Sequence, residues 1–195
     1  PDQPLFVSVN LSSRQLLRPE LVPEIRNLLG RAVLSRGSLR LEITESPGME
    51  NPEHATHVLD LLRDCGVDLA LDDFGTGYSS LAYLQRFPFD TIKIDKALVQ
   101  NATEDQASAA IVRAIVALAH ELGRTIVAEG VEAAEDAAFL RSLGCEYAQG
   151  YYYGEPMPER EVSALLRMLR KSERRMRRRG LVGGRSSGTP KGEAA

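Results

Sequence analysis

The sequence contains little of the chemistry that builds disulfide scaffolds or metal sites with sulfur and nitrogen ligands. It has only two cysteines and three histidines among 195 residues. Cys65 and Cys145 lack the spacing of a metal or redox motif, so we expect two small core residues of a reduced, cytosolic protein. His54 and His57 share a predicted helix with no third ligand nearby, so we expect them, like His120, at the surface.

Long apolar runs are also absent. No stretch approaches the length of a membrane span, and no signal peptide is visible. We therefore expect a cytoplasmic domain, with which a membrane anchor upstream in a longer parent protein would be compatible. The apolar fraction of 43% is ordinary for a soluble protein, and 195 residues suffice for one domain with a sizeable core.

Positive charge is scarce except near the end of the sequence. Residues 167–195 contain ten Lys or Arg and two Glu, a charge of +8 that leaves −11 on residues 1–166 for the net charge of −3. Glycine, serine and proline are frequent from Gly183 onward, which predicts disorder. We predict one domain over residues 1–170 and a disordered basic tail over residues 171–195.

The basic tail has two interpretations. An arginine run can contact nucleic acid or anionic lipid, whereas a helix that ends in a solubilising tail needs no partner. We favour the second interpretation and expect no nucleic acid polymer as a partner. Truncation at Gly180 is expected to leave any catalytic activity intact.

Six strand-like runs alternate with helix-like stretches along the rest of the sequence. The runs cover residues 5–10, 39–44, 67–72, 91–95, 125–129 and 146–149. The stretches with apolar residues at helical spacing cover residues 19–34, 52–65, 103–122, 134–143 and 158–168. This alternation predicts an α/β fold with a parallel sheet, and we expect a TIM-type (β/α) barrel.

The predicted barrel is incomplete. A full eight-stranded barrel needs about 250 residues, and only about six β/α units are visible. The sequence does not begin with methionine, and its first strand follows almost at once. We therefore expect the remaining units to precede Pro1.

A polar or charged residue lies at the end of every predicted strand. On strand parity these residues share the face that would line the lumen of a barrel. A single carboxylate in such a place often only caps the next helix. A whole set at carboxyl ends instead indicates an active site, because barrel enzymes keep their chemistry at that end. The residues are Asn10, Glu42, Asp72, Asp73, Lys93, Glu129 and Gln149.

The residue types of this set favour phosphoryl chemistry. Asn10, Glu42, Asp72 and Asp73 offer the hard oxygen ligands that suit Mg²⁺ or Mn²⁺ rather than Zn²⁺. Two such ions would activate a water and stabilise the leaving oxygen of a phosphodiester. Lys93 supplies a positive charge for a phosphate oxygen or the attacking water, and Glu129 is placed to act as the general base.

The turn after Asp73 narrows the interpretation. Gly75 and Gly77 bracket Thr76 beside the acidic pair, so the backbone can approach a ligand closely there. A Gly-x-Gly alone is weak evidence, but its combination with Asp72-Asp73 at a strand end is a more specific motif.

The ordered motifs resemble the EAL domain family, whose members hydrolyse cyclic di-GMP to linear pGpG. The resemblance covers about residues 6–158. It rests on Val7-Ser8-Val9-Asn10-Leu11-Ser12, Leu41-Glu42-Ile43-Thr44-Glu45, residues 72–81, Lys93-Ile94-Asp95, Val127-Ala128-Glu129-Gly130-Val131-Glu132 and Gln149-Gly150-Tyr151.

The resemblance assigns roles to these residues. It implies that Asn10, Glu42, Asp72 and Asp73 hold the two ions, that Lys93 positions the nucleophilic water and that Glu129 is the base. It also implies supporting roles, and Glu45 matches the position that tethers the loop over residues 72–81. The supporting residues are Glu45, Gly75, Thr76, Gly77, Asp95, Glu132 and Gln149.

The sequence departs from the family pattern in one respect. The Glu-Ala-Leu motif, whose glutamate is a metal ligand in the family, does not occur in these 195 residues. We therefore expect the chain alone to bind metal weakly, to aggregate or dimerise, and to turn over little. The resemblance further implies a homodimer and a cyclase-type or sensor domain upstream in the parent protein.

Three functions remain open on the sequence. A cyclic di-GMP phosphodiesterase is favoured by the intact downstream acidic set and the unbroken Gly-Thr-Gly turn. A non-catalytic cyclic di-GMP receptor is the alternative, but such receptors usually lose some ligands or the loop. An interaction remnant without a ligand would be compatible with the basic tail, yet it gives no reason for an intact acidic cluster.

Overall fold

The computed structural model describes residues 5–32, 34–44, 52–75 and 81–178 of the chain. Two compact units are distinguished. Residues 4–155 form the first unit, and residues 156–195 with the first three residues form the second. The first unit contains all of the described strands, and the second contains the last described helix.

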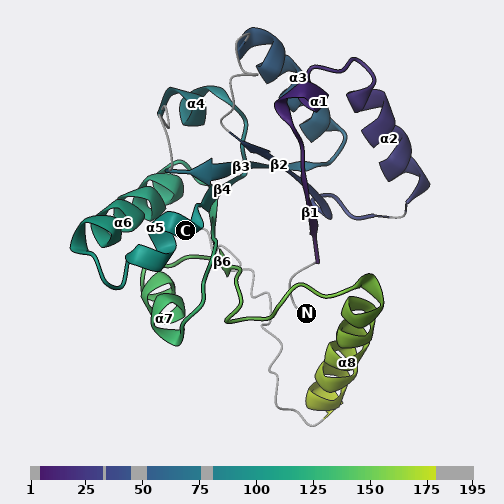
Figure 1. The fold of residues 1–195 in the computed structure, drawn as a ribbon. Coiled ribbons are helices and arrows are strands. Elements are labelled where there is room, and N and C mark those ends of the chain that lie inside the picture. Colours follow the sequence, from purple (N-terminus) through teal and green to yellow (C-terminus); the bar gives the residue numbers. More distant parts are fainter. Residues whose placement is uncertain (1–4, 33, 45–51, 76–80, 179–195) are drawn as a thin grey trace, which may run out of the picture. The chain divides into compact units, whose positions relative to one another are not determined.

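The first unit is built on a curled sheet of parallel strands in sequential order, as Figure 1 shows. Each strand pairs only with its neighbours in sequence, from β1 to β6. The strands are β1 (Val7–Asn10), β2 (Leu39–Thr44), β3 (Asp68–Phe74), β4 (Thr91–Ile94), β5 (Thr125–Ala128) and β6 (Tyr147–Ala148). The predicted α/β fold with six β/α units is confirmed, and the described strands form a half-barrel.

Helices follow the strands and pack on the outer face of the sheet (Figure 1). The helices of the first unit are α1 (Ser13–Leu16), α2 (Leu21–Arg31), α3 (Pro52–Asp64), α4 (Leu81–Arg86), α5 (Lys96–Asn101), α6 (Gln106–Glu121) and α7 (Ala134–Ser142). The four long helices agree with the predicted stretches to within about three residues at each end. The short helices α1, α4 and α5 were not predicted, because a helix of one or two turns has too few residues to show a period.

Local capping explains two of the short helices. Ser12 accepts a hydrogen bond from the backbone N–H of Gln15, and the Gln15 side chain accepts one from the backbone N–H of Ser12. This capping box satisfies free N–H groups at the start of α1. Asp95 caps α5 in the same sense, because its carboxylate accepts from Ala97 N at 2.7 Å.

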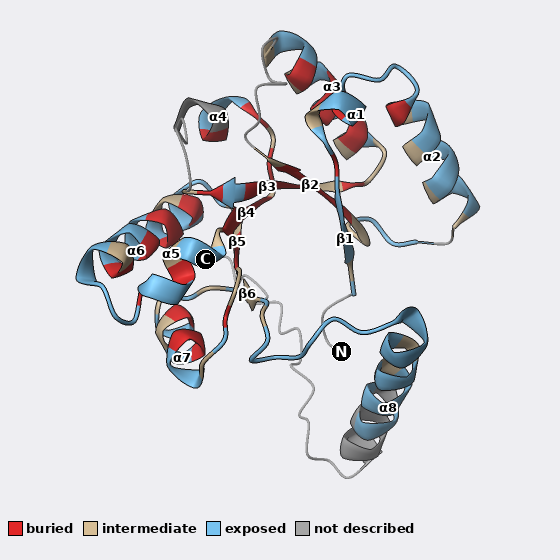
Figure 2. Ribbon diagram, viewed as in Figure 1, coloured by how far each residue is buried: buried red, intermediate tan, exposed pale blue. Residues whose placement is uncertain are grey.

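The main hydrophobic core lies between the strands and the long helices. Leu69, Leu71, Ile92, Ile94 and Ile126 are fully buried, and they alternate along β3 to β5 with residues of the opposite face. They pack in one cluster with apolar residues of α3 and α6. Figure 2 shows this core as the buried central strands with buried stripes on the surrounding helices. Each such aliphatic side chain contributes about 1.5–3 kcal/mol to stability when it leaves water.

The inner face of the sheet carries polar residues, and near the amino ends of the strands a buried arginine contacts two aromatic rings. The Arg40 guanidinium lies 4.0 Å from the centroid of the Phe6 ring and 5.8 Å from that of Tyr147. The two rings meet edge to face with centroids 5.4 Å apart. Residues next to the edge strand β1 and in the edge strand β6 therefore touch each other on the lumen side, although β1 and β6 do not pair.

The expectations for cysteine and histidine can be compared with the first unit. Both cysteines are free thiols, but they are half-buried rather than deep in the core. His54, His57 and His120 are exposed, as predicted. His120 Nε2 lies 3.0 Å from Glu146 Oε1, so this histidine has a structural contact away from the strand ends.

The second unit contains helix α8 (Glu159–Arg178). The helix continues ten residues beyond the predicted end at residue 168, so it extends into residues 171–195, where we placed the tail. Residues 179–195 of the predicted tail lie outside the described residues. None of the described helices combines the length and the apolarity needed to cross a bilayer.

Candidate active site

Four neighbouring strands bring their terminal charges together at the carboxyl edge of the sheet. Glu42 comes from β2, Asp72 from β3 and Lys93 from β4, while Glu129 directly follows β5. Lys93 Nζ lies 2.6 Å from Glu42 Oε2, 2.8 Å from Asp72 Oδ1 and 2.6 Å from Glu129 Oε1. One ammonium group therefore binds three carboxylates from three other strand ends. The predicted convergence on the lumen face is confirmed for these four side chains.

Burial makes this ion cluster strong. The side chains of Lys93, Glu42 and Asp72 are at most 10% exposed, and that of Glu129 is 16% exposed. Burial alone would lower the pKa of Lys93, but hydrogen bonds to Asp72, Glu129 and Glu42 outweigh it and raise the pKa above its usual range. Lys93 is therefore a permanent cation at physiological pH.

Burial and neighbouring charges raise the pKa of Glu129. Desolvation raises the pKa of its carboxyl group, the contact with Lys93 opposes that rise, and the charges of Asp72 and Glu42 add to it. Gln149 Nε2 donates a hydrogen bond to Glu129 Oε1 at 2.8 Å, which orients the carboxylate. A carboxylate whose pKa is raised toward neutrality accepts a proton more readily than an exposed one.

A distortion of β3 places two consecutive carboxylates on the same side. In a regular strand Asp72 and Asp73 would point to opposite faces. The register with β4 shifts between Leu71 and Phe74, and Asp73 has a φ of 56°, which is uncommon for a residue with a side chain. The Asp73 backbone N–H donates to Asp72 Oδ1 at 3.1 Å and supports this conformation.

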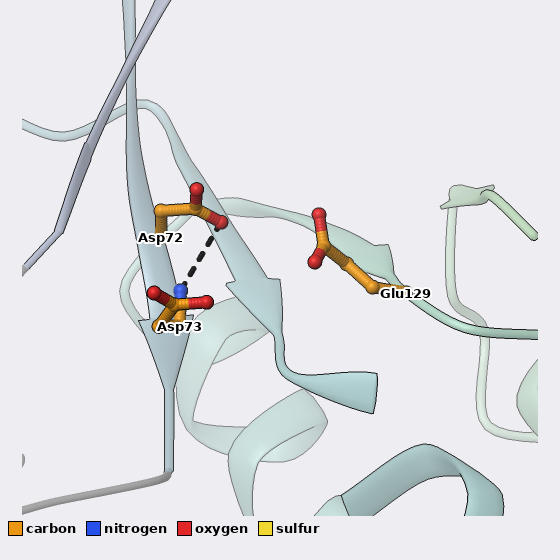
Figure 3. Close-up of side chains that lie close together, drawn as sticks. All are labelled: Asp72, Asp73 and Glu129. Atoms are coloured by element: carbon orange, nitrogen blue, oxygen red, sulfur yellow. Dashed lines mark hydrogen bonds between the residues drawn. The ribbon is translucent and has the colours of Figure 1, made fainter. Parts of the chain in front are cut away.

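The distortion produces a set of converging oxygens. A carboxylate oxygen of Asp72, one of Asp73 and one of Glu129 all lie within 4.8 Å of one another. Figure 3 shows Asp72 and Asp73 side by side on β3, with Glu129 pointing toward them from the end of β5. Desolvation raises the pKa of Asp73, and the charges of Asp72 and Asp95 raise it further. Such crowding of negative charge is relieved by a bound cation.

Of the other predicted ligand and loop residues, the structure describes some and leaves others undescribed. Asn10 pairs in register with Glu42 and is exposed at the edge strand. Gly75 has a φ of 102°, and a Cβ there would lie 2.4 Å from Leu98 Cδ1, so this position requires glycine. Glu45, Thr76 and Gly77 lie outside the described residues.

Asp95 and Glu132 lie near the cluster but contact helix α5. Asp95 caps the helix, and the Glu132 carboxylate accepts from Gln100 Nε2 at 2.7 Å. A Cβ on Gly130 would lie 2.4 Å from Lys96 Cβ, so glycine allows the segment after β5 to approach α5. The sequence analysis did not predict α5 or the role of Gly130. The glycine directly after Glu129 was the one feature of the sequence that could have indicated this close approach.

A parallel β/α barrel segment with charged side chains at the carboxyl ends of its strands defines a class of protein, the barrel enzymes. The sequence-family model of the EAL domain matches residues 1–156, and the chain belongs to this family.

Individual proteins support the assignment. The chain is 43% identical over 166 residues to the cyclic di-GMP phosphodiesterase NbdA of Pseudomonas aeruginosa, with 85% of the chain covered. It spans only 21% of the length of NbdA. Among solved structures, the EAL domain of Mycobacterium smegmatis DcpA superimposes with a TM-score of 0.80 at 39% identity, over 84% of this chain and 73% of that one. The MucR phosphodiesterase in complex with c-di-GMP gives a TM-score of 0.75 at 44% identity, over 80% and 64%.

Proposed function

We propose that this chain belongs to the catalytic domain of a phosphodiesterase that hydrolyses cyclic di-GMP to the linear dinucleotide pGpG. The observation that carries the proposal is the buried cluster of Lys93 with Glu42, Asp72 and Glu129. The names of NbdA and of the MucR complex support the choice of substrate, because both are phosphodiesterases for this nucleotide.

The cluster fits hard divalent cations. Glu42, Asp72, Asp73 and Glu129 bring four carboxylates against the single ammonium of Lys93, and three of them already present converging oxygens. Carboxylate and amide oxygens are the ligands that Mg²⁺ and Mn²⁺ prefer. We propose that Asn10, Glu42, Asp72 and Asp73 hold two such ions. When bound, these ions supply water activation and stabilisation of the leaving oxygen.

The side chains of this chain supply the remaining steps. Glu129 takes a proton from the attacking water, and Gln149 holds its carboxylate in place. The water oxygen forms a bond to phosphorus, and the bond from phosphorus to the ribose 3′ oxygen breaks. The proton is then returned to that leaving oxygen. Lys93 donates to the water or to a nonbridging phosphate oxygen, where negative charge accumulates.

Supporting roles are proposed for residues around the cluster. Asp95 and Glu132 fix α5 beside the segment that follows Glu129. Gly75 supports the close approach of the backbone at the end of β3. For Glu45, Thr76 and Gly77, which lie outside the described residues, we propose supporting roles on the family resemblance alone. Each role is testable by substitution against the turnover of the unchanged chain.

The cellular location and the assembly of the protein are proposed from its membership of the EAL domain family. We infer that the parent protein acts in the cytoplasm, that two copies of the domain pair, and that a cyclase-type or sensor domain precedes this one in the same polypeptide. Cross-linking and sedimentation of the purified protein test directly whether two copies of the domain pair. A strictly monomeric protein at micromolar concentration would contradict the proposed homodimer.

The experiment that tests the function is a chromatographic assay. The chain is incubated with cyclic di-GMP and Mn²⁺ or Mg²⁺, and the linear dinucleotide is followed over time. The matched variants are Glu129→Gln and Glu135→Gln, since Glu135 is an exposed glutamate on α7. Metal-dependent product that disappears only in Glu129→Gln supports the proposal. Because we expect this chain alone to turn over little, the same assay is run on the parent protein. Binding of the nucleotide without product by the parent protein would favour a receptor, and neither binding nor product would contradict both.

A further inference from the structure

Helix α8 carries a dense run of positive charge toward its end. Residues 167–178 contain seven Lys or Arg and a single Glu, a charge of +6, whereas residues 159–166 contain one Arg and two Glu. Cations near the end of a helix offset the helix dipole, but that effect is confined to the last turn. The run covers about three turns, so the dipole accounts for only part of it.

A row of apolar side chains lies along the same helix. Val162, Leu165 and Leu169 recur at the spacing of three and four residues that places side chains on one face, and Leu166 lies beside them. The first three are 38%, 40% and 50% exposed. Among the α8 side chains that the structure describes, none is buried, and Figure 2 shows that part of the helix as largely exposed. A contiguous exposed apolar row indicates a surface that another molecule covers.

Basic residues occupy the opposite face of the helix. Arg160, Arg167 and Lys171 follow one another at spacings of seven and four residues, and all three are exposed. At 3.6 residues per turn they lie about half a turn around the helix from Val162 and Leu169. Helix α8 therefore has one apolar face and one basic face.

The length of α8 changes the interpretation of the basic tail. The sequence predicts a helix end at residue 168, which would leave the following arginines in a solubilising tail. The helix instead continues to Arg178 and so carries the basic run and the apolar row on one element. A solubilising tail needs no apolar row, whereas a helix with a basic face and an apolar face is typical of the membrane interface.

Charge and apolarity together select one kind of partner. Nucleic acid and an anionic lipid bilayer both attract Lys and Arg, but only the bilayer also offers hydrocarbon to the apolar row. Residues 1–166 have a charge of −11, so attraction to an anionic surface is confined to this end of the chain. The described part of α8 is not apolar enough to cross a bilayer, so it would lie along the surface.

We propose that α8 binds the anionic surface of a lipid bilayer, with Val162, Leu165 and Leu169 toward the acyl chains and Arg167 and Lys171 at the headgroups. The inference goes beyond the proposed hydrolysis and does not depend on it. The cytoplasmic leaflet is the anionic one, which agrees with the proposed location of the protein.

The first experiment measures binding of the 195-residue chain to vesicles by flotation, in which bound chain rises with the vesicles and aggregated chain sinks. One set of vesicles contains phosphatidylcholine alone, and the other contains equal parts of phosphatidylcholine and phosphatidylglycerol, which is anionic. The charge variant combines Arg167→Gln with Lys171→Gln. Its matched control combines Arg26→Gln with Arg31→Gln, which removes the same charge from exposed positions on α2. Duplex DNA of mixed sequence is the competing polyanion.

The expected binding depends on lipid charge and on α8. The unchanged chain should bind the anionic vesicles and not the neutral ones, and added salt should weaken the binding. Each Lys or Arg near an anionic surface contributes about fivefold, so the charge variant should bind about 25-fold more weakly. The control should stay within about twofold of the unchanged chain, because the attraction falls off within a Debye length of the surface.

The second experiment reports which face of α8 enters the bilayer. The chain contains no tryptophan, so Leu169→Trp places a single fluorophore on the apolar face, and Ala164→Trp places one nearly opposite. With anionic vesicles the emission of Leu169→Trp should shift to shorter wavelength and be quenched by brominated lipid, while that of Ala164→Trp should change little. Thermal melts confirm that both variants are folded. If Leu169→Trp is unfolded, Leu165→Trp takes its place on the same face with the same criteria.

The other outcomes overturn the proposal. No binding to anionic vesicles, equal binding to both kinds of vesicle, or equal losses in the charge variant and its control would each contradict it. Tighter binding to DNA than to anionic vesicles, without an emission shift from Leu169→Trp, would make nucleic acid the partner. Emission from Leu169→Trp that is already at short wavelength without vesicles, and does not change when they are added, would show that the apolar row packs within the chain. Hydrolysis is measured separately from the linear dinucleotide, so none of these results decides the proposed function.

Discussion

Two buried cations point into the same lumen, and their surroundings differ sharply. Lys93, near the carboxyl ends of the strands, has three carboxylate oxygens within 2.8 Å. Arg40, near the amino ends, has one carboxylate contact, to Asp68 Oδ2 at 4.0 Å, and two aromatic rings. Within the described residues, Arg40 Nε and Nη1 are buried without a hydrogen-bond partner.

The two cations differ in what surrounds them: Lys93 lies among an excess of carboxylates, and Arg40 packs against aromatic rings. The carboxylates around Lys93 outnumber it, so the mouth has negative charge left for metal ions. The guanidinium of Arg40 instead lies over the Phe6 ring and near the Tyr147 ring, and these two rings contact each other from the two edges of the sheet. The cluster near the carboxyl ends is therefore the one whose charges can accommodate cations, and Arg40 near the amino ends packs against aromatic rings.

The largest expected effect is on the chemistry of the mouth. Glu129→Gln removes the proposed base and keeps the shape of the side chain, so turnover of cyclic di-GMP should fall by about 100- to 10,000-fold. Binding of the nucleotide should change little, because the amide loses charge rather than volume. Product formation by chromatography and binding by calorimetry measure the two quantities. Turnover that persists in this variant would remove Glu129 from the role of base.

The next largest effect is on stability at the mouth. Lys93→Met leaves Glu42, Asp72 and Glu129 facing one another without their cation. Removing one partner of a buried ion pair costs about 3–5 kcal/mol, so the free energy of unfolding should fall by that amount at neutral pH. Mn²⁺ should restore more stability to this variant than to the unchanged chain, because it replaces the lost positive charge. Denaturant unfolding with and without Mn²⁺ tests both statements.

The matching substitution at the amino end should cost less. Arg40→Met keeps apolar contact with Phe6 and Tyr147 and removes two nitrogens that have no partner. Replacing a weakly paired buried charge by an apolar side chain is often close to neutral, so we expect a loss of about 1 kcal/mol, from the cation–π contact. Denaturant unfolding alongside Lys93→Met gives the comparison. A loss as large as that of Lys93→Met would show that Arg40 is held by charge.

The smallest effect concerns the crowded carboxyl group of Asp73. Its folded pKa is raised, so its ionised form destabilises the fold, and the penalty is absent at pH values below the unfolded pKa. Asp73→Asn keeps a residue that tolerates positive φ and removes the charge. The melting temperature at neutral pH should rise by less than about 4 °C, and the gain should vanish in acid. An equal gain at both pH values would mean that charge is not its cause.

The sequence predicted the repeating part of the fold well. Strand and helix periodicity placed all six described strands and the four long helices of the first unit. It could not predict α1, α4 and α5, because one or two turns show no period. The predicted strand over residues 67–72 ends too early, because β3 runs to Phe74 through a register shift that no local pattern reveals.

The site was predicted in its members more than in its geometry. Strand parity brought Glu42, Asp72, Lys93 and Glu129 to one face, and their contacts confirm this. Our placement of Asp73 on the same face as Asp72 was wrong as a deduction from strand parity, because consecutive residues of a regular strand face opposite sides. Only the left-handed conformation of Asp73 brings its carboxylate to that of Asp72. The contact of Arg40 with Phe6 and Tyr147 joins residues far apart in sequence, which periodicity does not address.

The most direct test compares the two cations in the reaction itself. Equal amounts of folded unchanged chain, Arg40→Met and Lys93→Met are incubated with cyclic di-GMP and Mn²⁺, and formation of the linear dinucleotide is timed. The account predicts that Arg40→Met keeps the rate of the unchanged chain to within about threefold, while Lys93→Met loses at least about 100-fold. Equal losses in the two variants would contradict it.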